Sequence, residues 1–167
     1  KGFYSITKYS AEMLLRSFCE TFDVKYKIIR LANVIGRGDT KVSKKKNALQ
    51  YLIEEMRKGN DIALYSNGKF FRDYIHVDDV IDGISFIMNN GTHNEIYNMG
   101  GGEAILFGNI INYVHDKLNS KSKIGYMEPT KFHKIVGIGS KYLNTTKLKN
   151  LGFTPSYDIL YSLDLLL

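Results

Sequence analysis

The chain alternates between short runs of β-branched and aromatic residues and longer segments with apolar positions three and four residues apart. The short runs are typical of strands, and the periodic segments are typical of amphipathic helices. Strands are predicted at residues 27–32, 62–65, 71–75, 95–99 and 124–127. Helices are predicted at residues 4–22, 47–58, 78–90, 106–118 and 145–151, followed by an apolar tail from residue 159. This alternation predicts an α/β fold in which crossover helices join parallel strands.

The first predicted helix carries two polar side chains on its apolar stripe. Tyr4 and Lys8 are four residues apart, so they share one face of the helix. The same stripe continues through Ala11, Leu15, Phe18 and Phe22. A stripe that faces a core should be apolar along its whole length. Either the lysine therefore reaches solvent beyond the end of the core, or the two polar groups face a pocket.

The composition is that of a globular protein, with 44% hydrophobic and 24% charged residues among 167. No apolar run approaches the ~20 residues that a membrane-spanning helix needs, so we expect no membrane segment. Cys19 is the only cysteine, which excludes an internal disulfide and fits a reducing cytoplasm.

The net charge of +6 favours an anionic ligand. Nucleic acid is the first candidate for a basic protein, but the lysines are scattered, and only Lys41 and residues 44–46 form a cluster. We therefore expect no nucleic-acid partner. The histidines are widely separated and no Cys/His spacing supports a zinc site, so no metal is expected either.

Five successive segments carry motifs. They are residues 4–8 with 10–12, residues 30–36, 68–80, 95–103 and 146–155. In this order they resemble the Y-x-x-x-K, R-x-x-N-V-x-G, G-x-x-x-R-D-Y-I-H-V-D-D-V, Y-N-x-G-G and S/T-K-L…L-G-W/F-x-P motifs of one family. That family is the extended short-chain dehydrogenase/reductases, specifically the NAD-dependent epimerases and dehydratases that act on nucleotide sugars. A lone Y-x-x-x-K occurs often by chance, whereas five segments in family order do not.

The resemblance implies that the chain is the C-terminal portion of a Rossmann-type protein with a small α/β substrate-binding domain. Residues 1–36 would be the last part of the dinucleotide-binding domain. Residues 37–167 would be mainly substrate-binding domain, with some segments returning to the Rossmann sheet. Only residues 28–32 have the pattern of a fully buried central strand, which also indicates the later part of a larger fold. The N-terminal Rossmann half, with its Gly-rich turn for the cofactor, would be absent, so residues 1–167 alone are expected to be inactive.

By this resemblance Tyr4 is the general acid and base, and Lys8 assists it and hydrogen-bonds the nicotinamide ribose. An unperturbed tyrosine, with a pKa of about 10, is a poor base at neutral pH, and a nearby ammonium group favours the phenolate. The backbone around Val34 would lie near the nicotinamide amide. The cofactor implied is NAD or NADP, with NAD favoured.

Three further residues, Asn33, Arg72 and Asn98, are implied to bind the substrate. The guanidinium of Arg72 offers a planar fork of donors suited to the diphosphate of a nucleotide sugar. Its alternative role is a salt bridge to the adjacent Asp73. Asn33 and Asn98 lie at strand ends, where side chains project toward a ligand crevice, although asparagine is also common in turns.

Other polar residues in these motifs are expected to be structural. Asp78 and Asp79 fall in the first turn of a predicted helix, where acids cap the helix and interact with its dipole. His76 is expected to support the fold. The triple glycine at residues 100–102 lacks the spacing of a dinucleotide-binding turn.

The function implied is NAD(P)-dependent epimerisation or dehydration of a nucleotide-activated sugar through transient oxidation of a sugar carbon. A nucleotide-sugar reductase of the same family would use the same Tyr4 and Lys8. The alternative from another class is a non-catalytic sugar-nucleotide-binding or scaffold protein, and the presence of both residues argues against it. In relatives the first helix contributes to a dimer interface, so a homodimer is expected. Without the preceding half, the apolar residues of this helix should be only partly covered.

Overall fold

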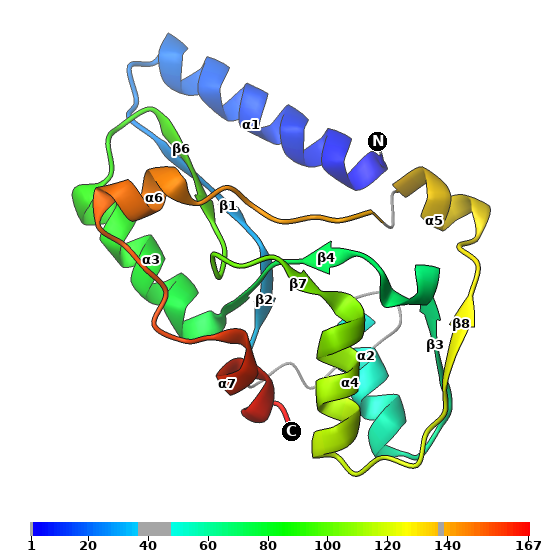
Figure 1. Cartoon of the computed structure of the whole chain (residues 1–167). Coiled ribbons are helices and arrows are strands. Elements are labelled where there is room, and N and C mark those ends of the chain that lie inside the picture. The colour runs from blue at the N-terminus through cyan, green and yellow to red at the C-terminus, as the bar shows by residue number, and fades with distance from the viewer. Residues whose placement is uncertain (1, 37–47, 137–138) are drawn as a thin grey trace.

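The computed structural model describes residues 2–36, 48–136 and 139–167 (Figure 1). Its helices are α1 (Phe3–Thr21), α2 (Ala48–Arg57), α3 (Val77–Asn90), α4 (Phe107–Lys117), α5 (Lys131–Val136), α6 (Thr146–Leu151) and α7 (Ile159–Asp164), with a 3-10 turn, η1 (Ser66–Gly68). Its strands are β1 (Lys27–Leu31), β2 (Asn33–Ile35), β3 (Ile62–Tyr65), β4 (Phe71–Arg72), β5 (Tyr74–His76), β6 (Glu95–Met99), β7 (Ile105–Leu106) and β8 (Ile124–Met127). The predicted α/β class is confirmed. The lysine cluster at residue 41 and residues 44–46 lies outside the described residues.

The described strands pair two by two. β1 pairs with β6, β2 with β5 and β3 with β8, each in parallel, whereas β4 and β7 are antiparallel. Only Ala32 separates β1 from β2. One extended segment therefore borders β6 along its first part and β5 along its second part (Figure 1).

Several elements differ from the sequence prediction. The strand predicted over residues 71–75 is interrupted at Asp73, which separates β4 from β5. Residues 131–136 form α5, and the apolar tail forms α7, neither of which the pattern predicts as a helix. α7 begins after Asp158, whose carboxylate accepts a hydrogen bond from the backbone N–H of Tyr161 and so caps the helix. In this helix Leu163 is fully buried.

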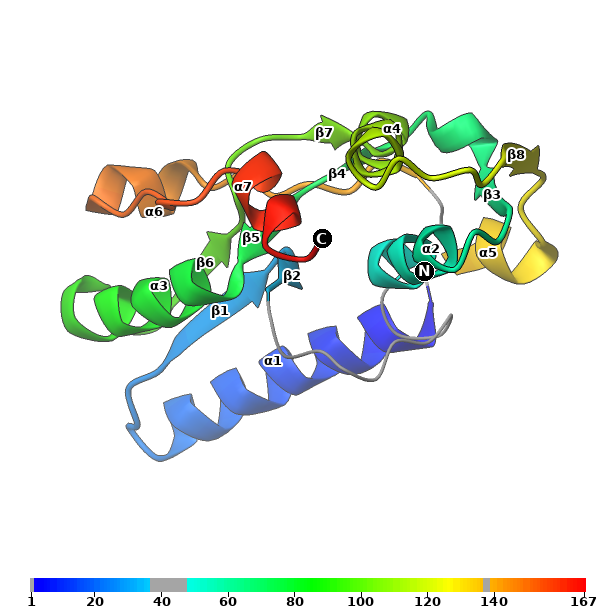
Figure 2. The same ribbon diagram turned by 90° about the horizontal axis from the view of Figure 1, so that it is seen from below.

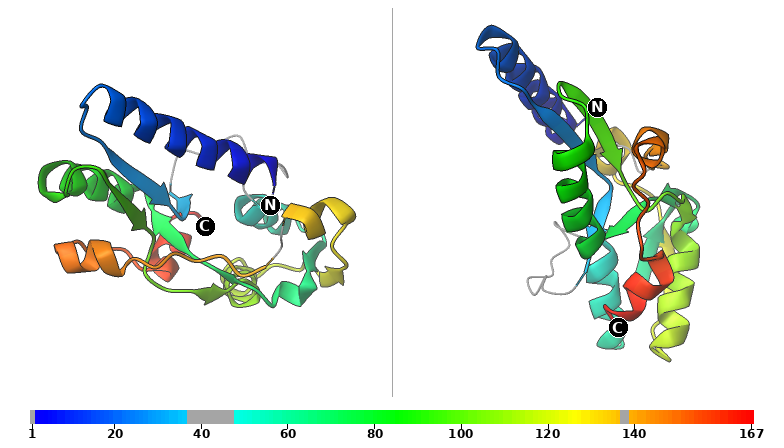
Figure 3. Two further views of the ribbon diagram at one scale, coloured as in Figure 1. Left: turned by 90° about the horizontal axis from the view of Figure 1, so that it is seen from above. Right: turned by 90° about the vertical axis from the view of Figure 1, so that its left-hand side faces the viewer.

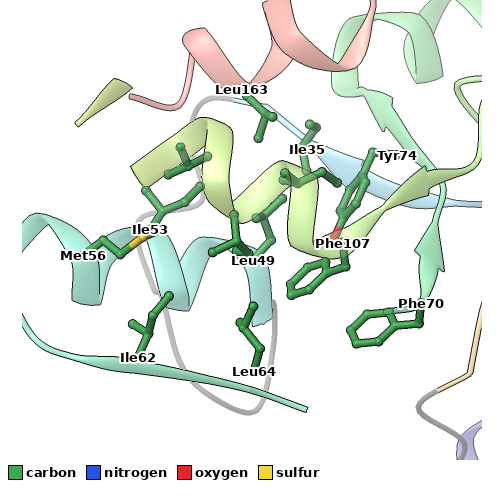
Figure 4. Packing of buried hydrophobic residues seen from close by; sticks show 13 residues of the cluster. Ile35, Leu49, Ile53, Met56, Ile62, Leu64, Phe70, Tyr74, Phe107 and Leu163 are labelled. Atoms are coloured by element: carbon green, nitrogen blue, oxygen red, sulfur yellow. The ribbon is translucent and has the colours of Figure 1, made fainter. Parts of the chain in front are cut away.

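The described side chains form two buried hydrophobic clusters. In the larger one, residues of α2, β3 and α4 point toward one another (Figure 4). The smaller one lies among α3, β6 and α6. Ile84 of α3 is 37% exposed. The buried face includes Gly83, where an added Cβ would approach Cε of Met99 to 2.6 Å, so Met99 occupies the space that a side chain would need.

Helix α1 lies on the outer side of β1, with α6 and α7 on the far side (Figures 2 and 3). Cys19 is its only buried residue. Its apolar residues between 13 and 18 and the following Phe22 are 43–72% exposed, which confirms that they are only partly covered. A bidentate ion pair attaches the helix to β1, because Arg30 donates to Glu12 through Nε (2.9 Å) and a terminal nitrogen (2.5 Å). No helix in the described parts of the chain is long and apolar enough to cross a membrane.

The start of α3 carries two buried polar residues with different partners. His76 caps the helix, and its Nδ1 accepts a hydrogen bond from the backbone N–H of Asp78, in agreement with its expected structural role. Asp79 does not act as a cap. Its carboxylate accepts the backbone N–H groups of Ser156 (2.7 Å) and Tyr157 (3.1 Å), so it binds the C-terminal segment to α3. The predicted capping role is therefore wrong for Asp79, because tertiary contact supplies the donors.

Asp79→Ala should lower the free energy of unfolding by about 2–4 kcal/mol, since two part-buried N–H groups lose their acceptor. Urea unfolding of the protein would measure the loss. Asp82→Ala, which removes an exposed acid from the same helix, should change stability by less than about 0.5 kcal/mol. Equal effects of the two substitutions would contradict the role assigned to Asp79.

Candidate functional site

The candidate site lies where the β1–β2 segment changes its neighbour. The backbone N–H of Ala32 donates to the carbonyl of Met99 at the end of β6 (2.9 Å). The next residue, Asn33, donates its backbone N–H (3.2 Å) and its side-chain Nδ2 (2.9 Å) to the carbonyl of Asp73. Ligand crevices of α/β proteins form outside the carboxyl ends of parallel strands. The structure therefore places Asn33, just beyond the ends of β1 and β6, where such a crevice is expected.

Asp73 is buried at this switch point, with 2% of its surface exposed. Its Oδ1 accepts the backbone N–H of Gly101 (2.9 Å), and its Oδ2 accepts that of Leu143 (3.2 Å). Burial raises the pKa of the Asp73 carboxyl, although the two amides act in the opposite direction. The carboxylate thus joins three segments that are far apart in the sequence.

The glycines at residues 100 and 101 allow this contact. A Cβ on Gly100 would lie 2.1 Å from Oδ2 of Asp73, and one on Gly101 would lie 2.1 Å from the carbonyl oxygen of Tyr74. Neither space can hold a side chain. The pair of glycines is thereby explained by close packing against the buried acid.

Arg72 is half-buried and does not pair with Asp73, whose carboxylate is occupied by the two amides. One terminal nitrogen of its guanidinium donates to the carbonyls of Phe71 (2.9 Å) and Gly139 (2.6 Å). The group also lies 4.3 Å from the ring centroid of Phe70. Burial lowers the pKa of Arg72, and within the described residues no carboxylate forms an ion pair with it. The result is a partly desolvated cation that forms no ion pair with a carboxylate of the described residues.

A segment from the C-terminal part of the chain runs beside β4. The hydroxyl of Ser140 accepts the backbone N–H of Phe71 (3.0 Å), and the backbone N–H of Lys141 donates to the carbonyl of Phe71 (3.0 Å). Arg72 and Lys141 form a parallel bridge. Residues 139–143, which we call the wall segment, thus lie along β4 beside the guanidinium.

The predicted asparagines both make contacts within the fold. Asn98 donates its Nδ2 to the carbonyl of Asn144 (3.1 Å), which follows the wall segment. Asn33 is exposed, and its Nδ2 is bound to the carbonyl of Asp73. Val34 lies half-buried in β2, pairs with Ile75 and packs against the smaller hydrophobic cluster. Asn33 is therefore bound to the sequence neighbour of Arg72, and Asn98 is bound to the residue that follows the segment beside β4.

Tyr4 and Lys8 lie in the first turns of α1, on the end of the helix that points toward α5 (Figures 1 and 3). The Lys8 ammonium is 5.8 Å from the centroid of the Tyr4 ring, so the two side chains share a face as predicted. Tyr4 is 75% exposed. Among the described residues, no hydrogen bond or ion pair links either side chain to Arg72, Asn33 or Asn98. The structure therefore has two polar groups of residues, one on α1 and one around Arg72.

Sequence reasoning missed two of the contacts that organise this region. Glu12 and Arg30 belong to two different motifs, and their pairing lowers the pKa of Glu12 mainly through the hydrogen bond from Arg30. Asp73 follows Arg72 in the R-D-Y motif, and the sequence suggests only Arg72 as its partner. Its actual partners are the backbone N–H groups of Gly101 and Leu143. In the part of the chain that the structure describes, no three His, Cys, Asp or Glu side chains are grouped to hold a metal ion.

A sequence model of the NAD dependent epimerase/dehydratase family matches residues 1–100, more than half of the chain. The chain belongs to this family. It is similar to the dTDP-4-dehydro-6-deoxyglucose reductase of Escherichia coli, with 25% identity over 126 residues, which are 75% of this chain and 40% of that protein. It is also similar to a putative UDP-glucose 4-epimerase of Methanocaldococcus jannaschii, with 24% identity over 157 residues, 93% of this chain and 49% of that protein. The chain thus spans half or less of the length of these relatives.

Solved structures of the family match nearly the whole chain. The UDP-glucose 4-epimerase of Thermotoga maritima, determined with UDP-glucose, has a TM-score of 0.86 and 28% identity, covering 97% of this chain and 51% of that one. The dTDP-glucose 4,6-dehydratase of Bacillus anthracis, in complex with NAD, has a TM-score of 0.82 at 22% identity and covers 98% and 50%. The fold is therefore that of about half of a Rossmann-type epimerase or dehydratase, as the resemblance implied.

Stability should depend on pH through Asp73. Because its folded-state pKa is raised, its contribution is fully present below the unfolded pKa of about 3.9 and is lost as pH rises through the raised value. The difference in unfolding free energy between the wild type and Asp73→Asn should therefore shrink as pH rises across this range. Urea unfolding between about pH 3.5 and 7 would measure it. A difference that grows with pH would mean that the amide hydrogen bonds outweigh burial.

Proposed function

We propose that the protein is a nucleotide-sugar epimerase or dehydratase in which Arg72 binds the diphosphate of the substrate. The observation that carries this proposal is the half-buried guanidinium without an acidic partner among the described residues. A desolvated cation gains much more from an anionic ligand than an exposed one does. Its position beside a strand switch point and the membership of the family support the same assignment.

Tyr4 and Lys8 are proposed as the residues that move the proton. The proposal is supported by their shared face on α1, where Tyr4 is exposed and neither side chain forms a hydrogen bond or ion pair with another described residue. A bound nicotinamide would take up and return a hydride. Tyr4 would remove the proton of a sugar hydroxyl through its phenolic oxygen and later return it. Lys8 would favour the phenolate and donate a hydrogen bond to the nicotinamide ribose.

Asn33 and Asn98 are proposed to contact the substrate, and the backbone at Val34 to lie near the nicotinamide. Since Nδ2 of each asparagine is bound to a carbonyl, the amide oxygens are the atoms that we assign to the ligand. The boundary near residue 36 is proposed as the division between the dinucleotide-binding part, residues 1–36, and the mainly substrate-binding part, residues 37–167.

NAD is the favoured cofactor, because similar structures from Bacillus anthracis and Thermus thermophilus were determined with NAD. A similar structure from Pseudomonas aeruginosa holds NADPH. A nucleotide-sugar reductase is the second candidate function, supported by the similarity to the Escherichia coli reductase. Both functions use the same proton-transfer pair.

We propose that the protein is a homodimer and that it is located in the cytoplasm. The exposed apolar side chains of α1 form the surface that a second copy would cover, since contiguous apolar patches favour association. The single cysteine, Cys19, suits a reducing compartment.

Arg72→Ala in the full-length protein should weaken the binding of UDP or dTDP roughly ten- to a hundredfold, because hydrogen bonds to a charged group are lost. Arg72→Lys should have an intermediate effect, because it keeps the charge but loses the planar fork. Calorimetric titration would measure both. Lys69→Ala, which removes a nearby exposed cation, is the matched control and should change affinity little. Unchanged affinity in both Arg72 variants would exclude the diphosphate site.

Tyr4→Phe should lower kcat on the nucleotide sugar by about 10²–10⁴-fold while leaving substrate affinity unchanged, because only the proton-transferring oxygen is removed. Steady-state kinetics with UDP-glucose and dTDP-glucose, with product identification, would test it. Tyr9→Phe, on the same exposed helix, should retain full activity. Full activity in Tyr4→Phe would reject the catalytic role, and a wild type that binds these sugars without turnover would identify a binding protein.

A further inference from the structure

We infer that Asp73 is the positioning residue of the Arg72 site, since it fixes the wall segment at residues 139–143 against which the guanidinium is held. The inference rests on the proposed function of Arg72 as the diphosphate ligand. It assigns to the buried acid an effect on the anion site that is exerted through backbone contacts and not through its charge.

The first step is the route from Asp73 to the guanidinium. Oδ2 of Asp73 accepts the N–H of Leu143 at one end of the wall segment (3.2 Å). At the other end of the segment, the carbonyl of Gly139 accepts the guanidinium of Arg72 (2.6 Å). Between these ends, the segment is held to β4 through Phe71 by two hydrogen bonds of 3.0 Å. The bonds at Phe71 and the anchor at Leu143 together hold the backbone that carries the Gly139 carbonyl.

The second step is the anchoring of Asp73 itself. Its backbone carbonyl accepts two hydrogen bonds from Asn33, and its Oδ1 accepts the N–H of Gly101. The missing side chains at Gly100 and Gly101 let the turn after β6 close onto the carboxylate. The acid is thus fixed from two sides before it holds the third segment. A buried carboxylate with both oxygens bound to rigid backbone is well suited to position a neighbour.

The third step is charge. An acid beside Arg72 that paired with it would compete with a phosphate group for the same donors. Asp73 instead directs both oxygens to amides, and the guanidinium binds neutral carbonyls. The arrangement orients the arginine and leaves its positive charge uncompensated by any carboxylate of the described residues.

The test is a double-mutant cycle in the full-length protein, with UDP as the probe. Asp73→Asn should weaken UDP binding about tenfold, as expected for a misplaced charged hydrogen bond. The same variant should leave NAD affinity unchanged. A variant that unfolds would lose NAD binding as well, so this control separates the two cases. Because Asp73 acts through Arg72, the double variant Asp73→Asn/Arg72→Ala should bind UDP no more weakly than Arg72→Ala alone. Asp82→Asn makes the same chemical change at an exposed position and should have no effect.

Additive losses, or unchanged UDP affinity in Asp73→Asn, would overturn the positioning role while leaving the diphosphate site intact. Unchanged affinity in Arg72→Ala would overturn the proposed function, and the inference with it. The two failures are distinguishable, because Arg72→Ala weakens UDP binding in the first case and does not in the second.

A measurement on the wild type covers the case in which Asp73→Asn does not fold. By linkage, a ligand that needs the anchored segment must stabilise it. UDP should therefore slow hydrogen exchange at the amides of Gly101 and Leu143 at least several-fold. The amide of Ser156, which is bound to the other buried acid, Asp79, is the internal control and should change little. Equal protection of all three amides, or none, would overturn the inference.

Discussion

The buried carboxylate of Asp73 is the contact on which the arrangement of the site depends. It lies where the β1–β2 segment leaves β6 and joins β5, and it binds the backbone of two other segments. Removing a carboxylate from water is costly, and the cost is tolerated only when both oxygens find donors. The backbone N–H groups of Gly101 and Leu143 are those donors, and the absence of a side chain at Gly100 leaves room for the carboxylate. The local backbone is therefore shaped around one acid.

The environment of Arg72 follows from the same contact. Because its sequence neighbour is occupied by amides, the guanidinium is held by carbonyls and by the ring of Phe70. Such a setting orients a cation without neutralising it. The burial that lowers the pKa of Arg72 is also what strengthens its attraction to an anion, because the local dielectric constant is lower than in water.

Helix α1 shows a different physical situation. The ion pair between Glu12 and Arg30 attaches it to β1, yet most of its apolar side chains face solvent. A partly exposed ion pair contributes only modestly to stability, so its apolar face is available for further contact. The chain spans about half of the matched relatives, so the proton-transfer role that we propose for Tyr4 and Lys8 concerns the longer protein.

The sequence by itself determined the α/β class, most helices and strands, and the order of the motifs, because periodicity and local turn chemistry depend on near neighbours along the chain. It also identified Tyr4 and Lys8 as a pair, since their spacing alone puts them on one helical face. Only the tertiary structure decided the partners of Asp73, Asp79 and Arg72. Each has a partner more than sixty residues away, at Leu143, Ser156 and Gly139 respectively. A carboxylate or a guanidinium has no intrinsic preference for one distant amide or carbonyl over another. The partners are therefore determined by how the chain packs.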